Sequence, residues 1–198
     1  MQDRPIVLAS TSAARIALLR GAGIAFRAES PPVDESTITA DSPGELALAR
    51  ARAKALSVAA AAPGALIIGS DQVAHFEGEV FGKPLDPDDH RRRLRLLRGQ
   101  THTLSTAAVV RLGAATVECL THARITFRSD LGDDELDAYV ATGEGAHCAG
   151  GYAVEGLGGN LVATIEGDHP SVLGLPLYRV VDALRGFGWR PSFPPAAR

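Results

Sequence analysis

The chain has 198 residues, of which 45% are hydrophobic and 22% are charged, and this balance predicts one globular domain over residues 1–198. Its formal net charge of −3 argues against general nucleic-acid binding, which needs a basic surface. No apolar run approaches the ~18 residues of a membrane span, and the N-terminus does not resemble a signal peptide. The two cysteines are too few for a disulfide framework. We therefore expect a cytoplasmic protein that binds neither nucleic acid nor membrane.

The first part of the chain alternates signals for strands and helices. Residues 6–9 predict a buried strand, and the helix that follows ends near Gly21. Alternating apolar residues predict a second strand over 24–28, and the acidic, Pro-containing stretch 30–41 predicts a loop. The sequence SPGE at 42–45 forms a capping box, from which we expect a helix to residue 62. Residues 66–70 predict a central strand, with a short hairpin at Gly78.

The second part continues this alternation. We expect a helix over 86–99, two long strands over 103–112 and 117–127, a helix over 133–141, a Gly-rich segment over 149–159, a strand over 161–165, a final helix to 185 and a Pro-rich tail over 190–198. Because strands and helices interleave throughout, the predicted class is α/β, with a mixed sheet and flanking helices.

Acidic residues stand where a site is expected. Asp71 directly follows the apolar strand at 66–70, and ligands of open α/β sheets bind beyond the carboxyl ends of strands. Its carboxylate could take a proton from water or bind a metal ion, or it could simply cap a turn. The loop pair Asp34 and Glu35 is either solvated or converges with Asp71 on a hard cation, which prefers oxygen ligands.

Several positive residues could hold an anion. Arg15 follows Ser10 on a strand-to-helix turn, where backbone N–H groups and the helix dipole favour anions. Arg50 and Lys54 lie four residues apart on one helix, so they indicate either a bound anion or a solvated face. Lys83 stands beside Pro84 in a loop, where it is either a ligand for the same anion or an unconstrained surface residue.

In this order, the segments resemble the Maf family of nucleotide pyrophosphatases. The matching segments are 8–15 (LASTSAAR), 34–35 (DE), 69–73 (GSDQV), 82–84 (GKP), 101–102 (TH), 149–152 (AGGY), 165–168 (IEGD) and 172–177 (VLGLPL). The resemblance extends over residues 6–186. It implies an inosine-triphosphatase-like fold with two lobes around a cleft, and homodimers as a family-level expectation.

The resemblance also implies a reaction and the residues that perform it. A nucleoside triphosphate would be hydrolysed between its α- and β-phosphates to a monophosphate and diphosphate, with Mg²⁺ or Mn²⁺ as cofactor. Carried over by position, Asp71 would be the general base, Asp71 and Glu35 would hold the metal, and the phosphates would be contacted by Ser10, Arg15, Lys54 and Lys83.

Three further positions sort family members by substrate, and here they are Ala14, Gln72 and Glu155. Gln72 and Glu155 are similar to the branch that acts on 7-methyl-GTP, whereas the dTTP/UTP branch shows Thr and Gln there. A carboxylate suits a base that methylation at N7 has made cationic. Ala14 departs from the large residue that is usual at its position.

Other functions are compatible with the same residues. The enzyme could act instead on dTTP and UTP or on non-standard purine nucleotides. The chain could also be a nucleotide-binding regulator of cell division without turnover, although the presence of Asp71, Glu35, Lys54 and Lys83 speaks against lost catalysis. A protein-interaction module would show no metal-dependent binding of nucleotides.

Overall fold

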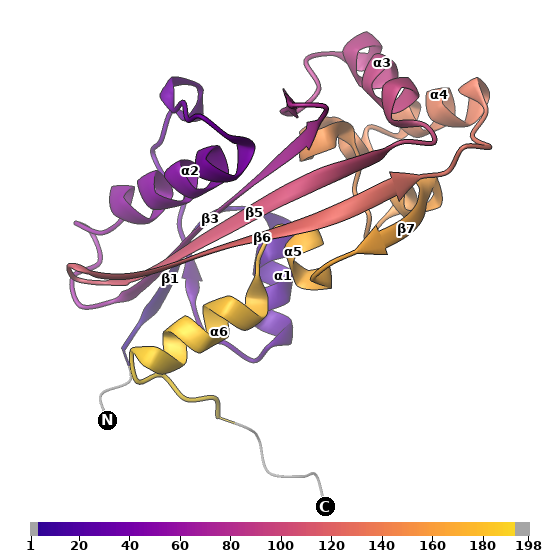
Figure 1. Cartoon of the computed structure of the whole chain (residues 1–198). Helices are drawn as coiled ribbons and strands as arrows, with labels where there is room; N and C mark the ends of the chain where they lie inside the picture. The colour runs from indigo at the N-terminus through magenta and orange to yellow at the C-terminus, as the bar shows by residue number, and fades with distance from the viewer. Residues whose placement is uncertain (1–3, 193–198) are drawn as a thin grey trace, which may run out of the picture.

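A seven-stranded mixed sheet forms the centre of the structure (Figure 1), a computed structural model that describes residues 4–192. Its strands are β1 (Ile6–Ala9), β2 (Arg27–Ala28), β3 (Leu66–Phe76), β4 (Glu79–Phe81), β5 (Thr101–Leu112), β6 (Ala115–Phe127) and β7 (Val162–Glu166). They follow the order β2-β1-β3-β5-β6-β7, with β4 paired to β3. β1 pairs in parallel with β2 and β3, and the other pairs are antiparallel. The predicted α/β class with a mixed sheet is confirmed.

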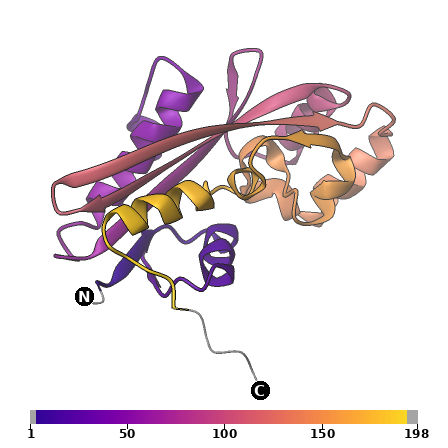
Figure 2. The same ribbon diagram turned by 60° about the horizontal axis from the view of Figure 1, so that its bottom comes forward.

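Helices cover both faces of this sheet and one of its ends (Figures 1 and 2). They are α1 (Ala13–Gly21), α2 (Pro43–Ser57), α3 (Pro87–Leu97), α4 (Asp133–Thr142), α5 (His169–Val172) and α6 (Leu177–Gly186). Alanines of α2 pack with Ile67 and Val109 on one face. Leucines of α1 and α6 pack with Ile68 and Val110 on the other. The alternation of side chains along β3 and β5 therefore gives each face its own helices.

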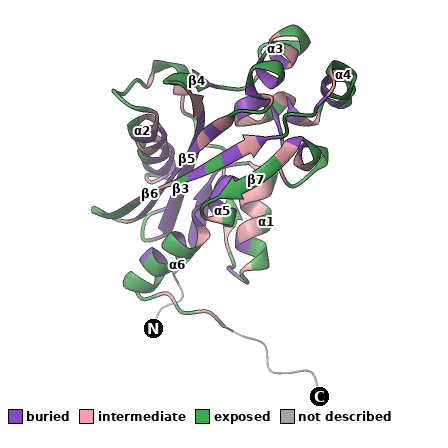
Figure 3. Ribbon diagram, turned by 45° about the vertical axis from the view of Figure 1, so that its right-hand side comes forward, coloured by how far each residue is buried: buried purple, intermediate pink, exposed green. Residues whose placement is uncertain are grey.

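A separate core lies at the far end of the long strands. It packs Phe81 and Phe127 against leucines of α3 and α4, and the short 3₁₀ turns Glu144–His147, Ala149–Gly151 and Leu157–Leu161 complete this end. Figure 3 shows buried residues along the central strands, while β7 at the sheet edge is largely exposed. The structure thus has two lobes that share β3, β5 and β6, as the family resemblance implies.

Several predicted boundaries are wrong. The helix expected to reach residue 62 ends at Ser57, and the chain tightens into i→i−3 hydrogen bonds such as Ala59 N to Leu56 O before Pro63. The second strand contains only Arg27–Ala28. Residues 193–198 of the predicted tail lie outside the described residues.

The prediction for β3 needs the largest correction. The sequence indicates a strand over 66–70 that ends before Asp71, but β3 runs on to Phe76. Its antiparallel register with β5 continues without a break from Leu66, opposite Leu112, to His75, opposite Thr103. Asp71 therefore lies inside a strand. The hydrogen-bonded pairing with β5 extends β3 through polar residues that the local sequence pattern assigns to a loop.

Candidate active site

Asp71 faces a break in the edge pairing of β3. In the described chain, the pairing of β3 with β1 ends at Gly69, and its pairing with β4 begins at Ala74. Asp71 thus stands beyond the carboxyl end of β1, although not of its own strand. A cavity of about 930 Å³ opens at this break and is lined by residues of both lobes. The position agrees with the general location of ligand sites in α/β sheets.

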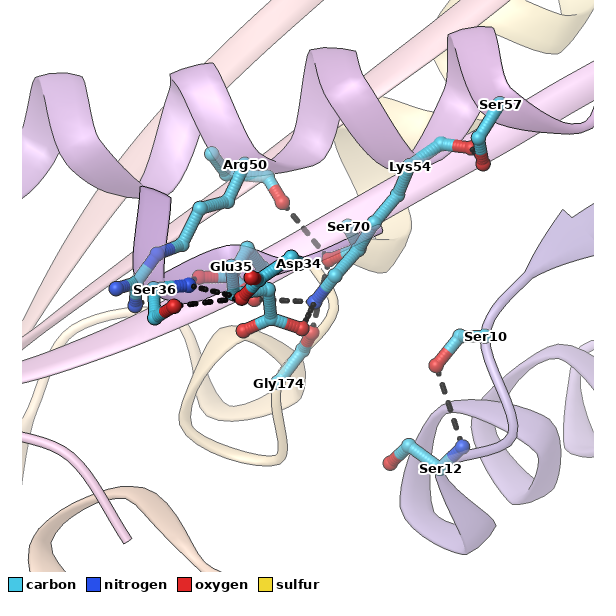
Figure 4. Close-up of polar contacts among 12 residues, drawn as sticks. Ser10, Ser12, Asp34, Glu35, Ser36, Arg50, Lys54, Ser57, Ser70 and Gly174 are labelled. Carbon is cyan, nitrogen blue, oxygen red and sulfur yellow. Dashed lines mark hydrogen bonds and ion pairs between the residues drawn. The ribbon is translucent and has the colours of Figure 1, made fainter. Parts of the chain in front are cut away.

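Lys54 reaches Asp71 because α2 lies unusually close to β3. A Cβ atom on Gly69 would stand 2.3 Å from the carbonyl oxygen of Ala51, so only glycine permits this approach. One helical turn further on, the Lys54 ammonium lies 2.5 Å from Asp71 Oδ1 and 2.8 Å from Glu35 Oε1. Figure 4 shows Lys54 extending from α2 toward Glu35. The structure therefore brings Glu35, Lys54 and Asp71 together, as the sequence predicts for ligands of one site.

The two carboxylates have different electrostatic surroundings. Burial raises the pKa of Asp71 above its ordinary value, although the charge and hydrogen bond of Lys54 oppose this. Partial burial acts in the same direction on Glu35, but the hydrogen bond and charge of Lys54 outweigh it and lower the pKa of Glu35. The raised pKa of Asp71 suits a proton acceptor, whereas the lowered pKa of Glu35 favours its charged form.

Only one member of the loop acid pair takes part in this cluster. Asp34 caps the 3₁₀ turn Glu35–Thr37, accepting hydrogen bonds from Ser36 N at 3.0 Å and from Ser36 Oγ at 2.6 Å. The hydrogen bond from the Ser36 side chain lowers the pKa of Asp34. This cap holds the turn from which Glu35 reaches Lys54, so Asp34 serves a structural role.

Ser10 and Arg15 line the opposite side of the cavity, at the start of α1. Ser12 caps this helix, and Ser10 Oγ accepts hydrogen bonds from Ser12 N and from the Arg15 guanidinium, both at 3.2 Å. Arg15 Nε donates to Gly174 O at 2.7 Å. Burial lowers the pKa of Arg15, while the charges of Asp71 and Glu35 oppose this. The guanidinium therefore lies within the electrostatic reach of both carboxylates.

Two residues in this region were not singled out from the sequence. Ser70 Oγ lies 3.0 Å from Gly174 O, which is also the acceptor for Arg15. Ser70 and Gly174 lie close together in Figure 4, and the two hydrogen bonds to Gly174 O connect β3 and α1 to the loop before α6. Their only sequence signal is membership of the segments GSDQV and VLGLPL, which reveals neither residue's partner.

Lys83 follows β4 and lines the cavity from the second lobe. It is exposed, and within residues 4–192 it forms no ion pair. Its charge contributes to the lowered pKa of Glu35. Lys83 therefore lies near the cluster without being held by it.

Ala14, Gln72 and Glu155 also line the cavity. The Gln72 amide nitrogen lies 2.8 Å from Ser171 O and 3.1 Å from Val172 O, so its donors hold α5 and its carbonyl oxygen is left for a ligand. Ala14 and Glu155 also line a second, more apolar cavity of about 480 Å³ beside α1. The structure therefore brings the three positions together around one cavity.

The carboxylates suit a small hard cation. Buried Asp71 Oδ2 has no hydrogen-bond partner in the described structure, and Glu35 lies on the same ammonium as Asp71. No group of three or more His, Cys, Asp or Glu residues positioned to hold a metal occurs between residues 4 and 192. Mg²⁺ is commonly bound by one or two carboxylates together with substrate phosphates. Over the same residues, no helix is both long and apolar enough to cross a membrane.

The chain is similar to known proteins over nearly its whole length. A family model described as Maf-like protein matches residues 5–187. The chain is 43% identical over 185 residues to the dTTP/UTP pyrophosphatase of Moorella thermoacetica, covering 92% of this chain and 95% of the relative. It is 42% identical over 199 residues to the nucleoside triphosphate pyrophosphatase of Streptomyces coelicolor, covering 96% of each. It is 40% identical over 188 residues to the 7-methyl-GTP pyrophosphatase of Methylobacillus flagellatus, covering 93% and 97%. The chain belongs to the Maf-like protein family.

Proposed function

We propose that the protein is a nucleoside triphosphate pyrophosphatase, which releases diphosphate and leaves a nucleoside monophosphate. The contact that carries this proposal is the buried Lys54 ammonium held between Asp71 and Glu35 in the large cavity. Arg15 of α1 and Lys83, which follows β4, line the same cavity. Positive groups from separate segments suit a polyphosphate, and the net-acidic chain needs no basic surface to bind it.

The residues divide the chemistry between them. Asp71, with its raised pKa, takes a proton from the water whose oxygen forms the new bond to phosphorus. The α–β anhydride bond breaks as that bond forms, and negative charge grows on the phosphate oxygens. Lys54, Arg15 and Lys83 offset this charge, and Ser10 hydrogen-bonds a phosphate oxygen. Preorganised charge of this kind is the main source of catalysis in phosphoryl transfer.

Glu35 and Asp71 would hold the divalent cation, Mg²⁺ or Mn²⁺. Oxygen ligands favour these ions, and Asp71 Oδ2 is unpartnered in the described structure. When bound, the cation would supply positive charge against the phosphates. Removal of the metal with a chelator should therefore abolish turnover, and readdition of Mg²⁺ or Mn²⁺ should restore it.

For the base, we propose 7-methyl-guanine. Glu155 brings a carboxylate to the junction of the two cavities, and Ala14 leaves space beside α1. An acid attracts a cationic purine as well as accepting its hydrogen bonds, whereas a neutral pyrimidine gains no such attraction. The expected specificity is thus for 7-methyl-GTP.

A second substrate class, dTTP and UTP, is favoured by the names of relatives. Several proteins named dTTP/UTP pyrophosphatase are 39% to 43% identical to this chain, and the 7-methyl-GTP pyrophosphatase of Methylobacillus flagellatus is 40% identical. Identity over the whole chain does not separate the classes. The base is set by a few residues, so the two proposals differ in what Ala14, Gln72 and Glu155 do.

The test is diphosphate release from 7-methyl-GTP, GTP, dTTP and UTP, with Mg²⁺ or Mn²⁺. Wild type is compared with Asp71→Asn, which removes the base, and with Glu155→Gln, which removes only the charge proposed to select the base. We expect turnover of 7-methyl-GTP that is lost in Asp71→Asn. Glu155→Gln should reduce the preference for 7-methyl-GTP over GTP by roughly tenfold and leave GTP turnover in place.

Each alternative predicts a different pattern. Turnover centred on dTTP and UTP would keep the reaction and refute the proposed base. Binding of nucleotides without release of diphosphate would support the regulatory function instead. Absence of both binding and turnover with either metal would contradict every nucleotide-based proposal.

A further inference from the structure

Arg50 is a partly buried cation on the same helix as Lys54. Its side chain is 21% exposed and lines the cavity, with a terminal nitrogen 3.9 Å from Asp71 Oδ2. At that distance the pair attracts but forms no hydrogen bond. The buried Arg50 Nε has no hydrogen-bond partner within the described residues. A buried N–H left without an acceptor costs free energy, and a bound anion beside the guanidinium would offset this cost.

Arg50 lies at one end of the row of positive groups. Figure 4 shows Arg50 and Lys54 descending from α2, with Ser10 on the far side of the Lys54 ammonium. Arg15 belongs to the Ser10 side, where the two side chains are hydrogen-bonded. An extended anion that reaches from Ser10 past Lys54 therefore meets Arg50 last.

The second cavity shows which end of a nucleotide lies on the Ser10 side. Its lining is largely apolar, including Ala14, Leu18 and Leu173, and it adjoins the large cavity through Ala14, Leu173 and Glu155. A base needs apolar walls with few polar groups, whereas a phosphate chain needs cations. The base end thus belongs beside α1, and the phosphate chain extends from there toward α2.

We propose that Arg50 binds the diphosphate portion of the nucleotide, the part that leaves as inorganic diphosphate. This inference rests on the proposed pyrophosphatase function. The planar guanidinium presents several N–H donors and suits bidentate contact with phosphate oxygens. The 3.9 Å contact with Asp71 is too long for a hydrogen bond, so the donors of the terminal nitrogens stay available. Arg50 would therefore be a substrate-binding residue in addition to Lys54, Arg15 and Lys83.

Arg52 provides a matched control on the same helix. Its guanidinium makes two 2.6 Å hydrogen bonds to the Glu118 carboxylate on the exposed side of α2, and it does not line the cavity. Arg52→Gln removes the same charge from the same helix as Arg50→Gln. Any effect of overall charge or helix propensity is shared by the two variants, whereas an effect of phosphate contact is not.

The experiment uses inorganic diphosphate as the probe. Calorimetric binding of diphosphate, and its inhibition of nucleotide turnover, are measured for wild type, Arg50→Gln, Arg50→Lys and Arg52→Gln. We expect Arg50→Gln to weaken diphosphate binding by about 10- to 100-fold, the value of hydrogen bonds to a charged group. Inhibition by the nucleoside monophosphate should change by less than about threefold, a difference too small for a lost hydrogen bond. Arg52→Gln should leave both unchanged.

Arg50→Lys keeps the charge but loses the planar fork, so it should show an intermediate weakening; this variant decides the matter if Arg50→Gln fails to fold. Unchanged diphosphate affinity in both Arg50 variants, with wild-type turnover intact, would overturn the inference and leave the pyrophosphatase proposal standing. A lower kcat and a shifted pH profile with unchanged diphosphate affinity would also overturn it, because Arg50 would then act only through Asp71. Wild type that binds neither nucleotide nor diphosphate would refute the proposed function itself.

Discussion

Substitution of Gly69 by alanine tests the contact on which the whole site depends. A Cβ atom there would lie 2.3 Å from Ala51 O and 2.8 Å from Ala55 N, about 1 Å closer than ordinary van der Waals contact. Both neighbours are backbone atoms of α2, so no side chain can rotate away. The helix as a whole must move away from β3.

The size of the effect follows from this displacement. Overpacking of a well-packed contact costs about 1–3 kcal/mol, which lowers the Tm of a domain of this size by about 2–12 °C. The same movement carries Lys54 away from Asp71 and Glu35, which lie 2.5 and 2.8 Å from its ammonium. A misplacement of about 1 Å in a catalytic group can cost roughly 100-fold in rate. Activity should therefore fall further than stability alone explains.

Thermal unfolding and diphosphate release would be measured on Gly69→Ala beside Gly186→Ala. Gly186 ends α6, and a Cβ atom there meets nothing within 4 Å, so its substitution should be neutral or stabilise by about 0.4–1 kcal/mol. Gly69→Ala with a wild-type Tm and wild-type turnover would refute the close approach of α2 to β3. A lowered Tm with full activity in the folded protein would refute the link between this approach and Lys54.

Three further substitutions probe the buried polar groups. Lys54→Met should lower stability by about 3–5 kcal/mol because Asp71 is left as a buried charge, and adding Asp71→Asn should restore most of the lost Tm without restoring turnover. Burial lowers the pKa of His102 to about 4. As the pH falls, the unfolded chain therefore takes up a proton at this residue before the folded protein does, so the free energy of unfolding should decline by about 3 kcal/mol between pH ~6.5 and pH 4. His102→Gln should flatten that part of the Tm–pH curve. Gln72→Ala should cost about 1–3 kcal/mol in urea unfolding, because Val172 O at the end of α5 loses its side-chain donor, whereas Ser171 O keeps the hydroxyl of Thr106.

The sequence predicts which residues lie together at the site better than it predicts the strand boundaries and strand pairing that position them. Most elements were expected from apolar periodicity and capping signals, and Asp86 and Ser42 do cap the helices that follow them. Periodicity could not show that β3 continues through Asp71, because the pairing with β5 that carries it comes from residues thirty and more positions later. Long-range pairing overrides the local signal.

The contacts that individual side chains make were the hardest feature to predict from the sequence. The sequence treats Asp34 and Glu35 alike, yet one caps a turn and the other contacts Lys54. Helical spacing places Arg50 and Arg52 on different faces of α2, but it does not show that one lies toward Asp71 and the other toward Glu118. The difference depends on where α2 rests on the sheet, which is fixed by Gly69 and therefore by a contact in space.

For the proposed complex with a triphosphate and a divalent cation, the charges of the site indicate why the outlying cations would also be needed. The positive charges of Lys54 and Arg50 balance the negative charges of Asp71 and Glu35, since all four lie in one connected cluster. A nucleoside triphosphate brings about four further negative charges. Arg15, Lys83 and one divalent cation supply the same number of positive charges, so the complex is close to neutral only when all three are present. Loss of Arg50 would leave the cluster net negative before the substrate arrives, and this repulsion acts on the phosphate chain rather than on the base.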